Sequence, residues 1–236
     1  VAKYTTLQRF TLINFLKNRL PDNFINYNKK VSKIDHKSDN IEVTFENSAS
    51  IKCDYLIISD GVFSKTKSLI AKKEIKPRYF NSVALRATID KNDLQGIDLS
   101  NISIFLGSNL HYVSYPVDSK GQLNFISILR KKLSSKEFSD YSLFESKNFI
   151  SSILSEISKQ VDPDIIKNLK GIRCFPIFVS SEVHRPESRN TFLIGDAFFA
   201  LPPTFAQGAS QSIEVAHELY KNLENEDNQF NIERIE

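Results

Sequence analysis

Apolar residues near the start of the chain recur every three or four positions, which predicts an amphipathic helix over residues 5–19 that ends before Pro21. Residues 30–34 and 41–45 instead alternate between apolar and polar, and a polar turn at 37–40 separates them. Successive side chains of a strand point to opposite faces, so this alternation with a turn between predicts a β-hairpin.

A strand followed by a short helix is predicted next. Residues 51–58 favour a strand, and the continuous apolar run at 55–58 is typical of a parallel strand that is covered on both faces. A short helix is expected over residues 63–71. The charged segment 72–80 contains Pro77 and predicts a crossover to the next part of the chain.

The middle of the chain predicts an antiparallel sheet. Four apolar runs with turn signals between them follow one another without a long helix: residues 81–90, 101–106, 111–117 and 122–130. Residues 143–159 then predict an amphipathic helix, and a shorter helix starts at Pro163. Strands are expected again at 171–180 and 191–194, and the chain's last helix at 207–224.

These elements predict the fold class α/β plus antiparallel β. Residues 1–75 and 171–236 are expected to form one α/β domain, and residues 76–170 an antiparallel sheet domain inserted into it. The chain has 236 residues, of which 41% are hydrophobic, and this supports a folded globular protein rather than a disordered one.

Charge and cysteine usage narrow the class of protein further. The net charge of +3, from 31 basic and 28 acidic residues, is too small and too evenly spread to predict nucleic-acid binding. No apolar run reaches the roughly 18–20 residues of a membrane span, and the first residues lack the apolar core of a signal peptide, so a cytoplasmic protein is expected. Cys53 and Cys174 are too far apart to form a metal pair or a disulfide framework, and no metal site is predicted.

The first candidate motif spans residues 53–64. An apolar strand delivers Asp60 and Gly61 to its carboxyl end, where open α/β sheets bind ligands. Gly61 permits a tight turn, and Ser64 is placed to cap the helix that follows. An Asp-Gly turn after a strand is common, so this motif indicates a binding site only in combination with a second motif.

The second motif spans residues 191–214 and is more specific. An apolar strand again ends in a Gly-Asp pair, Gly195 and Asp196, and a Pro-Pro loop leads to a helix start at Gln207 and Gly208. A carboxylate at a strand end can accept hydrogen bonds from sugar hydroxyls. The N–H groups of a helix N-terminus favour anions and delocalised negative charge.

Together the two motifs resemble the fingerprints of the class A FAD-dependent aromatic-ring monooxygenases, nearest to ubiquinone-biosynthesis hydroxylases and salicylate-hydroxylase-like enzymes. The family pattern D-x-L-x-x-A-D-G-x-x-S-x-V-R lies beside residues 54–67. The pattern G-D-A-A-H-x-x-x-P-x-x-G-Q-G-x-N-x-A-I-E-D-A lies beside residues 195–216. A looser third match surrounds Arg9, and the resemblance covers residues 5–224.

The resemblance implies a role for each matching residue of the second motif. Asp196 would bind the ribityl chain of FAD, and Pro203 would lie against the isoalloxazine ring. The backbone of Gln207, Gly208 and Ala209 would also lie against the ring, with the helix N-terminus stabilising negative charge on it.

Further binding residues are implied elsewhere in the chain. Arg9 would approach the phosphate or ribityl region of FAD, and Val31 would meet the adenine through its backbone. Asp60 would help to fix the pyrophosphate and the approach of NAD(P)H. Arg86, on a predicted strand of the inserted domain, points either to a substrate cavity or to solvent. No catalytic residue is named.

The function implied by the resemblance is hydroxylation of an aromatic or quinone-precursor ring with FAD, NAD(P)H and O2. The partner is then a small molecule, a peripheral membrane contact is left open, and the oligomeric state is undetermined. Two alternatives stay open: a non-catalytic remnant or interaction module of the same fold, and a related flavoprotein reductase or halogenase.

The sequence also departs from the family pattern. Phe199 stands where the family often has His, Ala206 where it has Gly, Ser210 where it has Asn, and Lys67 where it has Arg. The family begins with a strand, G-x-G-x-x-G and a helix, whereas this chain has only seven glycines and no such motif. The absence of methionine points the same way, so a fragment that lacks its N-terminal dinucleotide-binding unit is expected.

Overall fold

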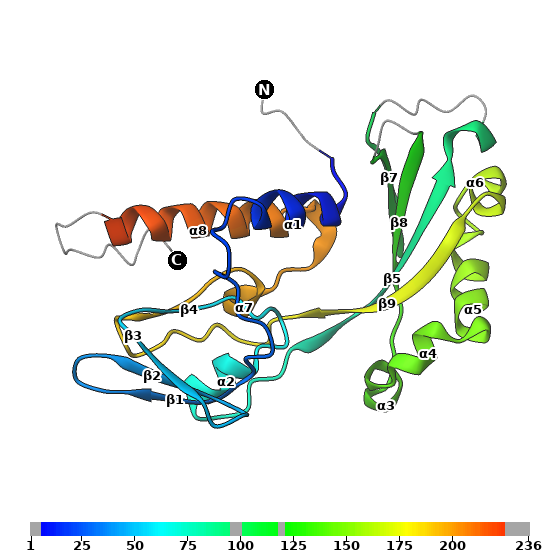
Figure 1. The fold of residues 1–236 in the computed structure, drawn as a ribbon. Coiled ribbons are helices and arrows are strands. Elements are labelled where there is room, and N and C mark those ends of the chain that lie inside the picture. Colours follow the sequence, from blue (N-terminus) through cyan, green and yellow to red (C-terminus); the bar gives the residue numbers. More distant parts are fainter. Residues whose placement is uncertain (1–5, 95–100, 118–120, 225–236) are drawn as a thin grey trace. The chain divides into compact units, whose positions relative to one another are not determined.

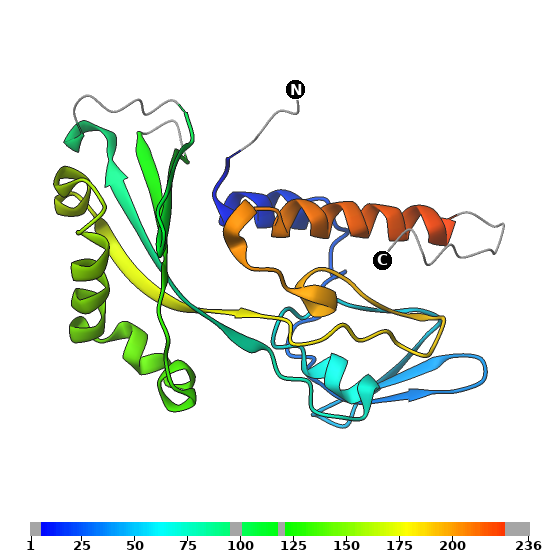
Figure 2. The ribbon, with the colours of Figure 1, turned by 180° about the vertical axis from the view of Figure 1, so that it is seen from behind.

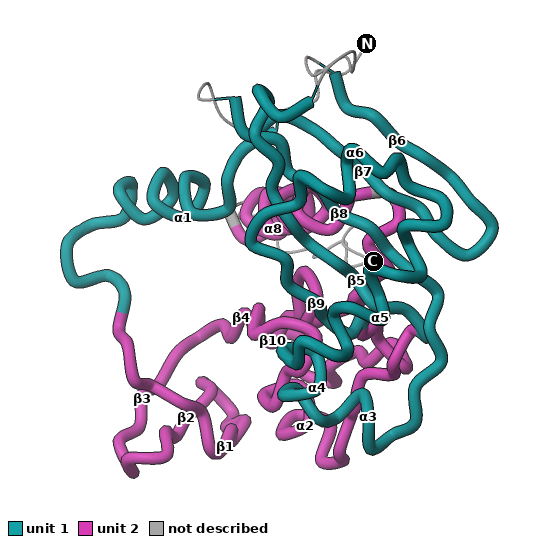
Figure 3. Tube along the Cα trace, turned by 90° about the vertical axis from the view of Figure 1, so that its right-hand side faces the viewer, with its two compact units in different colours: residues 1–25, 81–177 teal, residues 26–80, 178–236 magenta. Residues whose placement is uncertain are grey.

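The structure is a computed structural model that describes residues 6–94, 101–117 and 121–224. The chain divides into two compact units, coloured separately in Figure 3. Unit 1 comprises residues 1–25 and 81–177, and unit 2 comprises residues 26–80 and 178–236. Residues 6–25 and 171–177 thus belong with the inserted sheet by their contacts, and the predicted split of FAD and substrate roles between two domains stays a prediction.

Unit 1 is built on a five-stranded sheet with the strand order β6-β7-β8-β5-β9. Its strands are β5 (Arg78–Asp90), β6 (Ser103–Leu106), β7 (Leu110–Pro116), β8 (Gln122–Arg130) and β9 (Lys170–Val179). The pairs β6–β7, β7–β8 and β5–β8 are antiparallel, which confirms the sheet predicted from the four apolar runs. The predicted crossover at 72–80 ends early, because β5 already begins at Arg78.

Helices cover one face of this sheet (Figures 1 and 2). They are α4 (Tyr141–Glu145), α5 (Lys147–Ile157) and α6 (Pro163–Lys167), and the short helix α3 (Ser135–Ser139), which has no buried residue, precedes them. The single helix predicted over 143–159 is wrong: Ser146 is extended, and its hydroxyl accepts the Phe149 N–H, so that it caps a new helix. Serine is a preferred N-cap residue, and here the cap divides the apolar run in two.

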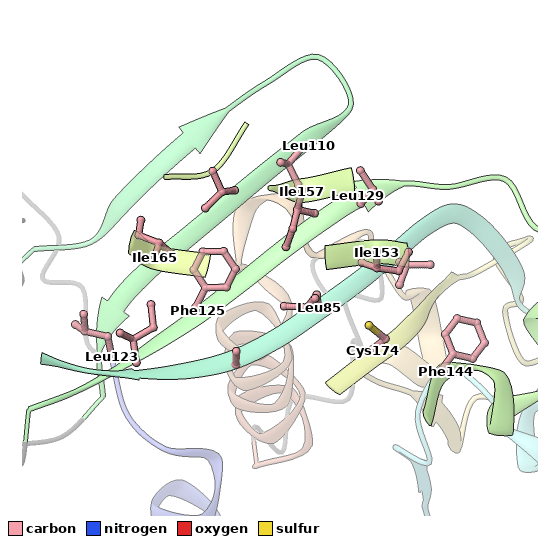
Figure 4. Packing of buried hydrophobic residues seen from close by; sticks show 14 of the residues in the cluster. Leu85, Leu110, Leu123, Phe125, Leu129, Phe144, Ile153, Ile157, Ile165 and Cys174 are labelled. Atoms are coloured by element: carbon pink, nitrogen blue, oxygen red, sulfur yellow. The ribbon is translucent and has the colours of Figure 1, made fainter. Parts of the chain in front are cut away.

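The core of unit 1 lies between α4–α6 and the sheet (Figure 4). Alternate residues of the strands point into it, and the register places Leu85, Ser127 and Tyr112 side by side on this face. Ile153 and Ile157 of α5 are fully buried against them. The sheet face toward the helices is therefore the packed one, and the opposite face carries the remaining positions.

Helix α1 (Arg9–Lys17) also belongs to unit 1. It starts four residues later than the predicted helix, and none of its residues is buried. Phe10 has 71% of its surface exposed. The predicted helix is confirmed, but its apolar side chains remain accessible to solvent. A short 3₁₀ helix, η1 (Lys91–Asp93), follows β5.

Unit 2 contains two small sheets. Strands β1 (Val31–His36), β2 (Ile41–Phe45) and β3 (Ser50–Cys53) form an antiparallel sheet, which confirms the predicted hairpin. Strands β4 (Leu56–Ile58) and β10 (Thr191–Leu193) form a parallel pair. The prediction of a strand covered on both faces is wrong in the described structure, because Ile57 is 45% exposed and only Ile58 of β4 is buried.

The helices of unit 2 follow these strands directly. They are α2 (Lys65–Ala71), α7 (Asp196–Phe199), the 3₁₀ turn η2 (Pro203–Phe205) and α8 (Gly208–Glu224). The predicted fold class, α/β with antiparallel β, is confirmed. In the described ranges no helix is long and apolar enough to cross a membrane.

Candidate functional site

The candidate site lies where two parallel strands end. Strands β4 and β10 pair in register, with Ile58 opposite Leu193, and the Ile194 N–H donates to the Ile58 carbonyl at 3.0 Å. An exposed aspartate follows each strand, Asp60 two residues after the end of β4 and Asp196 three residues after the end of β10. Both motifs therefore deliver a carboxylate to the same edge of one sheet, the edge at which open α/β sheets bind ligands.

A glycine shapes the turn after β10. Gly195 has φ +58° and ψ −143°, a region that residues with a Cβ rarely occupy. Its carbonyl accepts the N–H groups of Phe198 and Phe199 at 3.0 and 3.1 Å, and this starts α7. Ala197 is fully buried in a cluster with Ile58 and Leu193. The turn thus holds Asp196 at the surface while the next side chain anchors it.

The Pro-Pro loop is fixed at its beginning by a reciprocal contact. The Ser180 N–H donates to the Ala200 carbonyl at 3.0 Å, and the Ala200 N–H donates to the Ser180 Oγ at 2.8 Å. Pro203 begins η2 and is exposed, and Ala206 ends it with φ +52°. Ala206 stands where the family has Gly, and the positive φ explains that preference.

Helix α8 begins directly after this loop. Its first i→i−4 hydrogen bond runs from the Gln211 N–H to the Gln207 carbonyl at 2.9 Å. The N–H groups of Gly208, Ala209 and Ser210 precede it and have no partner within the helix. All three residues are exposed, and the helix has 17 residues, so a full helix dipole ends there. This end of α8 is suited to a delocalised negative charge.

The end of strand β4 is connected by hydrogen bonds to the start of helix α2. The hydroxyl of Ser64 accepts the Lys67 N–H at 2.9 Å, which confirms the predicted cap, and the Asp60 carboxylate accepts the Thr66 N–H at 3.2 Å. Lys67 is buried, and burial lowers the pKa of its ammonium group while the Asp60 and Glu182 carboxylates act in the opposite direction. Asp60 therefore serves the local fold as well as the edge of the sheet.

The predicted binding residues are divided between the two units. Asp196, Pro203, Gln207, Gly208 and Ala209 lie on one continuous segment of unit 2.

The remaining predicted residues lie elsewhere. Asp60 is on the neighbouring strand end, and Val31 is half-buried on β1 against the apolar cluster of the hairpin. Arg9 and Arg86 belong to unit 1. The roles of these residues toward a ligand stay predictions.

Two residues of unit 1 near Arg86, Phe175 and Arg173, were not among the predicted site residues. The Arg86 guanidinium lies over the ring of Phe175, with 5.9 Å from Cζ to the ring centroid. Arg173 lies two residues before Phe175 on β9, and both side chains are exposed. Period-two alternation along 170–179 could have placed them on one face, but the partner strand of β9 could not be read from that alternation.

The chemistry of these donors fits part of a flavin. An exposed carboxylate suits ribityl hydroxyls, and the N–H groups at the start of α8, which have no partner within the helix, suit the polar edge of the ring. A glycine-rich turn for a pyrophosphate is absent from the sequence. Among the described residues no three His, Cys, Asp or Glu side chains are grouped as a metal site.

Comparison with known families agrees with this geometry. The model of the family described as FAD binding domain matches residues 25–228. The chain is 22% identical over 243 residues to a salicylate hydroxylase of Pseudomonas putida, covering 93% of this chain and 54% of that protein. It is 21% identical to a 3-amino-4-hydroxybenzoate 2-monooxygenase of Streptomyces platensis, covering 91% of this chain and 53% of that protein. The chain therefore spans about half the length of the curated relatives it matches.

Solved structures show the same fold. A salicylate hydroxylase in a substrate complex superimposes with a TM-score of 0.75 at 18% identity, covering 92% of this chain and 57% of that one. Klebsiella pneumoniae HpxO, complexed with FAD and uric acid, gives a TM-score of 0.74 at 19% identity, covering 93% of this chain and 55% of that one. The structural likeness confirms the fold class, and the family match over residues 25–228 confirms the resemblance that the two motifs carry.

Proposed function

From the premise that the chain belongs to the FAD binding domain family, we propose that it forms part of a flavin-dependent monooxygenase that hydroxylates an aromatic ring with FAD, NAD(P)H and O2. One observation carries the proposal. The parallel pair β4–β10 brings Asp60 and Asp196 to one edge of a sheet, and the turn at Gly195 packs against helix α8.

Each part of this edge has a task toward the cofactor. The Asp196 carboxylate accepts hydrogen bonds from ribityl hydroxyls, and the N–H groups of Gly208 and Ala209 donate to negative charge at the ring. Pro203 shields the ring from water without adding a competing donor. A bound flavin supplies the transfer of electrons from NAD(P)H to O2. The side chains bind and orient the flavin and exclude water from it.

The overall reaction balances without an acid–base pair from the chain. NAD(P)H gives two electrons, one oxygen atom of O2 enters the ring, and the other leaves as water. No catalytic side chain is therefore assigned. The relatives named for salicylate and aminohydroxybenzoate, and the structure that holds uric acid, support a small aromatic or heteroaromatic substrate. A quinone precursor and a peripheral membrane contact stay predictions.

The test is made on the protein purified from its native source and on its variants. We expect flavin absorbance, and NAD(P)H consumption that requires O2 and yields a hydroxylated aromatic product. Asp196→Asn should weaken FAD binding about tenfold to a hundredfold, because a hydrogen bond to a charged group contributes about 1.5–3 kcal/mol. Asp22→Asn, at an exposed turn of unit 1, is the matched control.

Two results would overturn the proposal. A protein without bound flavin that gains none on FAD titration would favour the non-catalytic alternative. A flavoprotein that consumes NAD(P)H without hydroxylated product would favour a reductase.

A further inference from the structure

The five-stranded sheet of unit 1 has two edge strands, β6 and β9, which differ in how they protect their outer edges. Strand β9 carries the exposed cations Lys170 and Arg173 and also Pro176, which has no N–H group to donate. Charged residues and proline are the devices by which natural edge strands avoid pairing with other chains. Strand β6 lacks these devices, because residues 101–115 contain no proline and no Asp, Glu, Lys or Arg.

The side chains of β6 are mostly apolar and all exposed. Ile104 is 63% exposed and Leu106 is 78% exposed, and the register places both on the sheet face away from the helices. Among the strands of the described ranges, none pairs with the outer side of β6. An apolar edge strand without charge or proline is the kind that pairs with a strand of another chain.

The hairpin between β6 and β7 shows which backbone groups of this edge are available. The Gly107 N–H donates to the Leu110 carbonyl at 2.7 Å. In an antiparallel pair, residues that bond to the neighbouring strand alternate with residues that do not. Phe105 therefore bonds to β7, whereas the N–H and C=O groups of Ile104 and Leu106 point outward. A partner strand can exchange hydrogen bonds with these two residues.

A stack of aromatic rings crosses the core face of the sheet and ends at β6. The Phe105 and Tyr112 rings stack with centroids 5.1 Å apart, and the Tyr112 and Phe125 rings stack at 5.4 Å. Phe105 is the end of this stack and keeps 37% of its surface exposed. A further strand beside β6, at the usual spacing of about 4.8 Å, could place another ring next to Phe105.

We propose that the outer edge of β6 is the interface of a homodimer, in which the β6 strands of two copies pair antiparallel about a two-fold axis at Phe105. This register sets Ile104 of one copy opposite Leu106 of the other, so their outward N–H and C=O groups exchange hydrogen bonds. Phe105 lies opposite its own copy and continues the aromatic stack. Because the strand is uncharged, pairing with itself brings no like charges together.

The length of the strand limits the strength of this dimer. Strand β6 has four residues, so the contact belongs to the small interfaces of weak, transient complexes. We therefore expect a dimer that dissociates on dilution. An isologous contact uses the same edge on both copies, and the other edge of the sheet is protected, so association stops at the dimer.

Sedimentation equilibrium of the full chain, between about 10 μM and about 1 mM, measures the dimer Kd. Leu106→Lys introduces an edge charge and should raise this Kd about tenfold or more. Ile104→Pro removes an outward N–H group without removing a β6–β7 hydrogen bond, and should raise it by a similar factor. Ile51→Lys is the matched control and should leave the Kd unchanged, because Ile51 is 52% exposed on β3, an edge strand of unit 2.

Hydrogen exchange locates the contact in the wild-type chain. The N–H groups of Ile104 and Leu106 should exchange more slowly as the protein concentration rises, whereas the Phe105 N–H, which already bonds to β7, should change less. Circular dichroism checks the fold of each variant.

Four outcomes overturn the inference. They are a chain that stays monomeric up to about 1 mM, a dimer that either Leu106→Lys or Ile104→Pro leaves intact, an equal loss from Ile51→Lys, and assemblies larger than a dimer. An effect of Leu106→Lys without one of Ile104→Pro would mean that apolar contact, and not strand pairing, joins the copies. These measurements need neither flavin nor substrate, so their result does not depend on the proposed function.

Discussion

Gly195 and Ser212 lie so close that a Cβ atom on the glycine would be 3.0 Å from the serine Oγ. The Ser212 hydroxyl is itself held by the Gly208 carbonyl, to which it donates at 2.7 Å. This approach joins the end of β10 to the first turns of α8, and so fixes Asp196 relative to the N–H groups at the start of that helix.

Gly195→Ala should therefore destabilise unit 2 strongly. The backbone region alone costs about 1–3 kcal/mol for a residue with a Cβ, and the contact with Ser212 adds to it. Gly171→Ala is the matched control, because Gly171 has φ +62° with nothing within 4 Å of a Cβ. Urea unfolding of both variants measures the difference. Equal losses would mean that the close approach carries no energy.

Ala206→Gly should stabilise the chain. Ala206 has φ +52°, and a left-handed conformation costs a residue with a Cβ about 1–2 kcal/mol. Glycine removes this cost but gives the unfolded chain more freedom, so a net gain of about 1 kcal/mol or less is expected. A higher urea midpoint at unchanged slope would confirm it, and a lower midpoint would show that the alanine methyl group makes a contact worth more than the strain.

Ser127→Ala should also stabilise the chain, by about 1 kcal/mol. The Ser127 side chain is fully buried on the core face of β8, and its hydroxyl finds no hydrogen-bond partner among the described residues. An unpaired buried hydroxyl costs free energy that alanine avoids. Ser180→Ala should do the reverse, because the Ser180 hydroxyl, on a side chain that is also buried, accepts the Ala200 N–H at 2.8 Å. Losses of stability of similar size in both variants would contradict the conclusion that the Ser127 hydroxyl is unpaired.

Cys174 should make stability fall at high pH. Burial raises the pKa of its thiol from 9.0 to about 11, so the folded state keeps a proton that the unfolded state releases. The protonated Cys174 thiol therefore contributes on the order of 2 kcal/mol to the free energy of unfolding. This contribution is fully present below pH 9 and is lost as the pH rises through 11. Cys174→Ala should show a shallower decline between these pH values. Cys53→Ala should flatten the decline less than Cys174→Ala, because the Cys53 thiol is only half-buried, although burial raises its pKa as well.

The chain by itself should bind FAD weakly. Its residues can hold the ring and ribityl half, while the sequence has no glycine-rich turn for the pyrophosphate. Each missing hydrogen bond to a charged group costs roughly 1.5–3 kcal/mol, and about 1.4 kcal/mol is a tenfold loss. Quenching of flavin fluorescence measures this affinity. Submicromolar binding would contradict this prediction and would mean that the chain holds the pyrophosphate at a site without a glycine-rich turn.

The sequence by itself determined the elements and the two motifs, because both depend on local physics. Side-chain alternation specified the hairpin and the antiparallel strands, and the Gly-Asp pair with its Pro-Pro loop specified a strand end followed by a helix start. The boundary at Ser146 escaped prediction, because a single capping hydrogen bond outweighed a continuous apolar period.

Tertiary structure decided what the motifs do together. Asp60 and Asp196 are far apart in the chain, and only the parallel pairing of β4 with β10 places them at one edge. The sequence did not decide whether Arg86 points to a cavity or to solvent, because the residue opposite a strand position depends on the register of the sheet. Pairing with Ile126 and the ring of Phe175 gave it a face and a partner. Local periodicity says which side of a strand a residue takes, but only long-range pairing says what lies beside it.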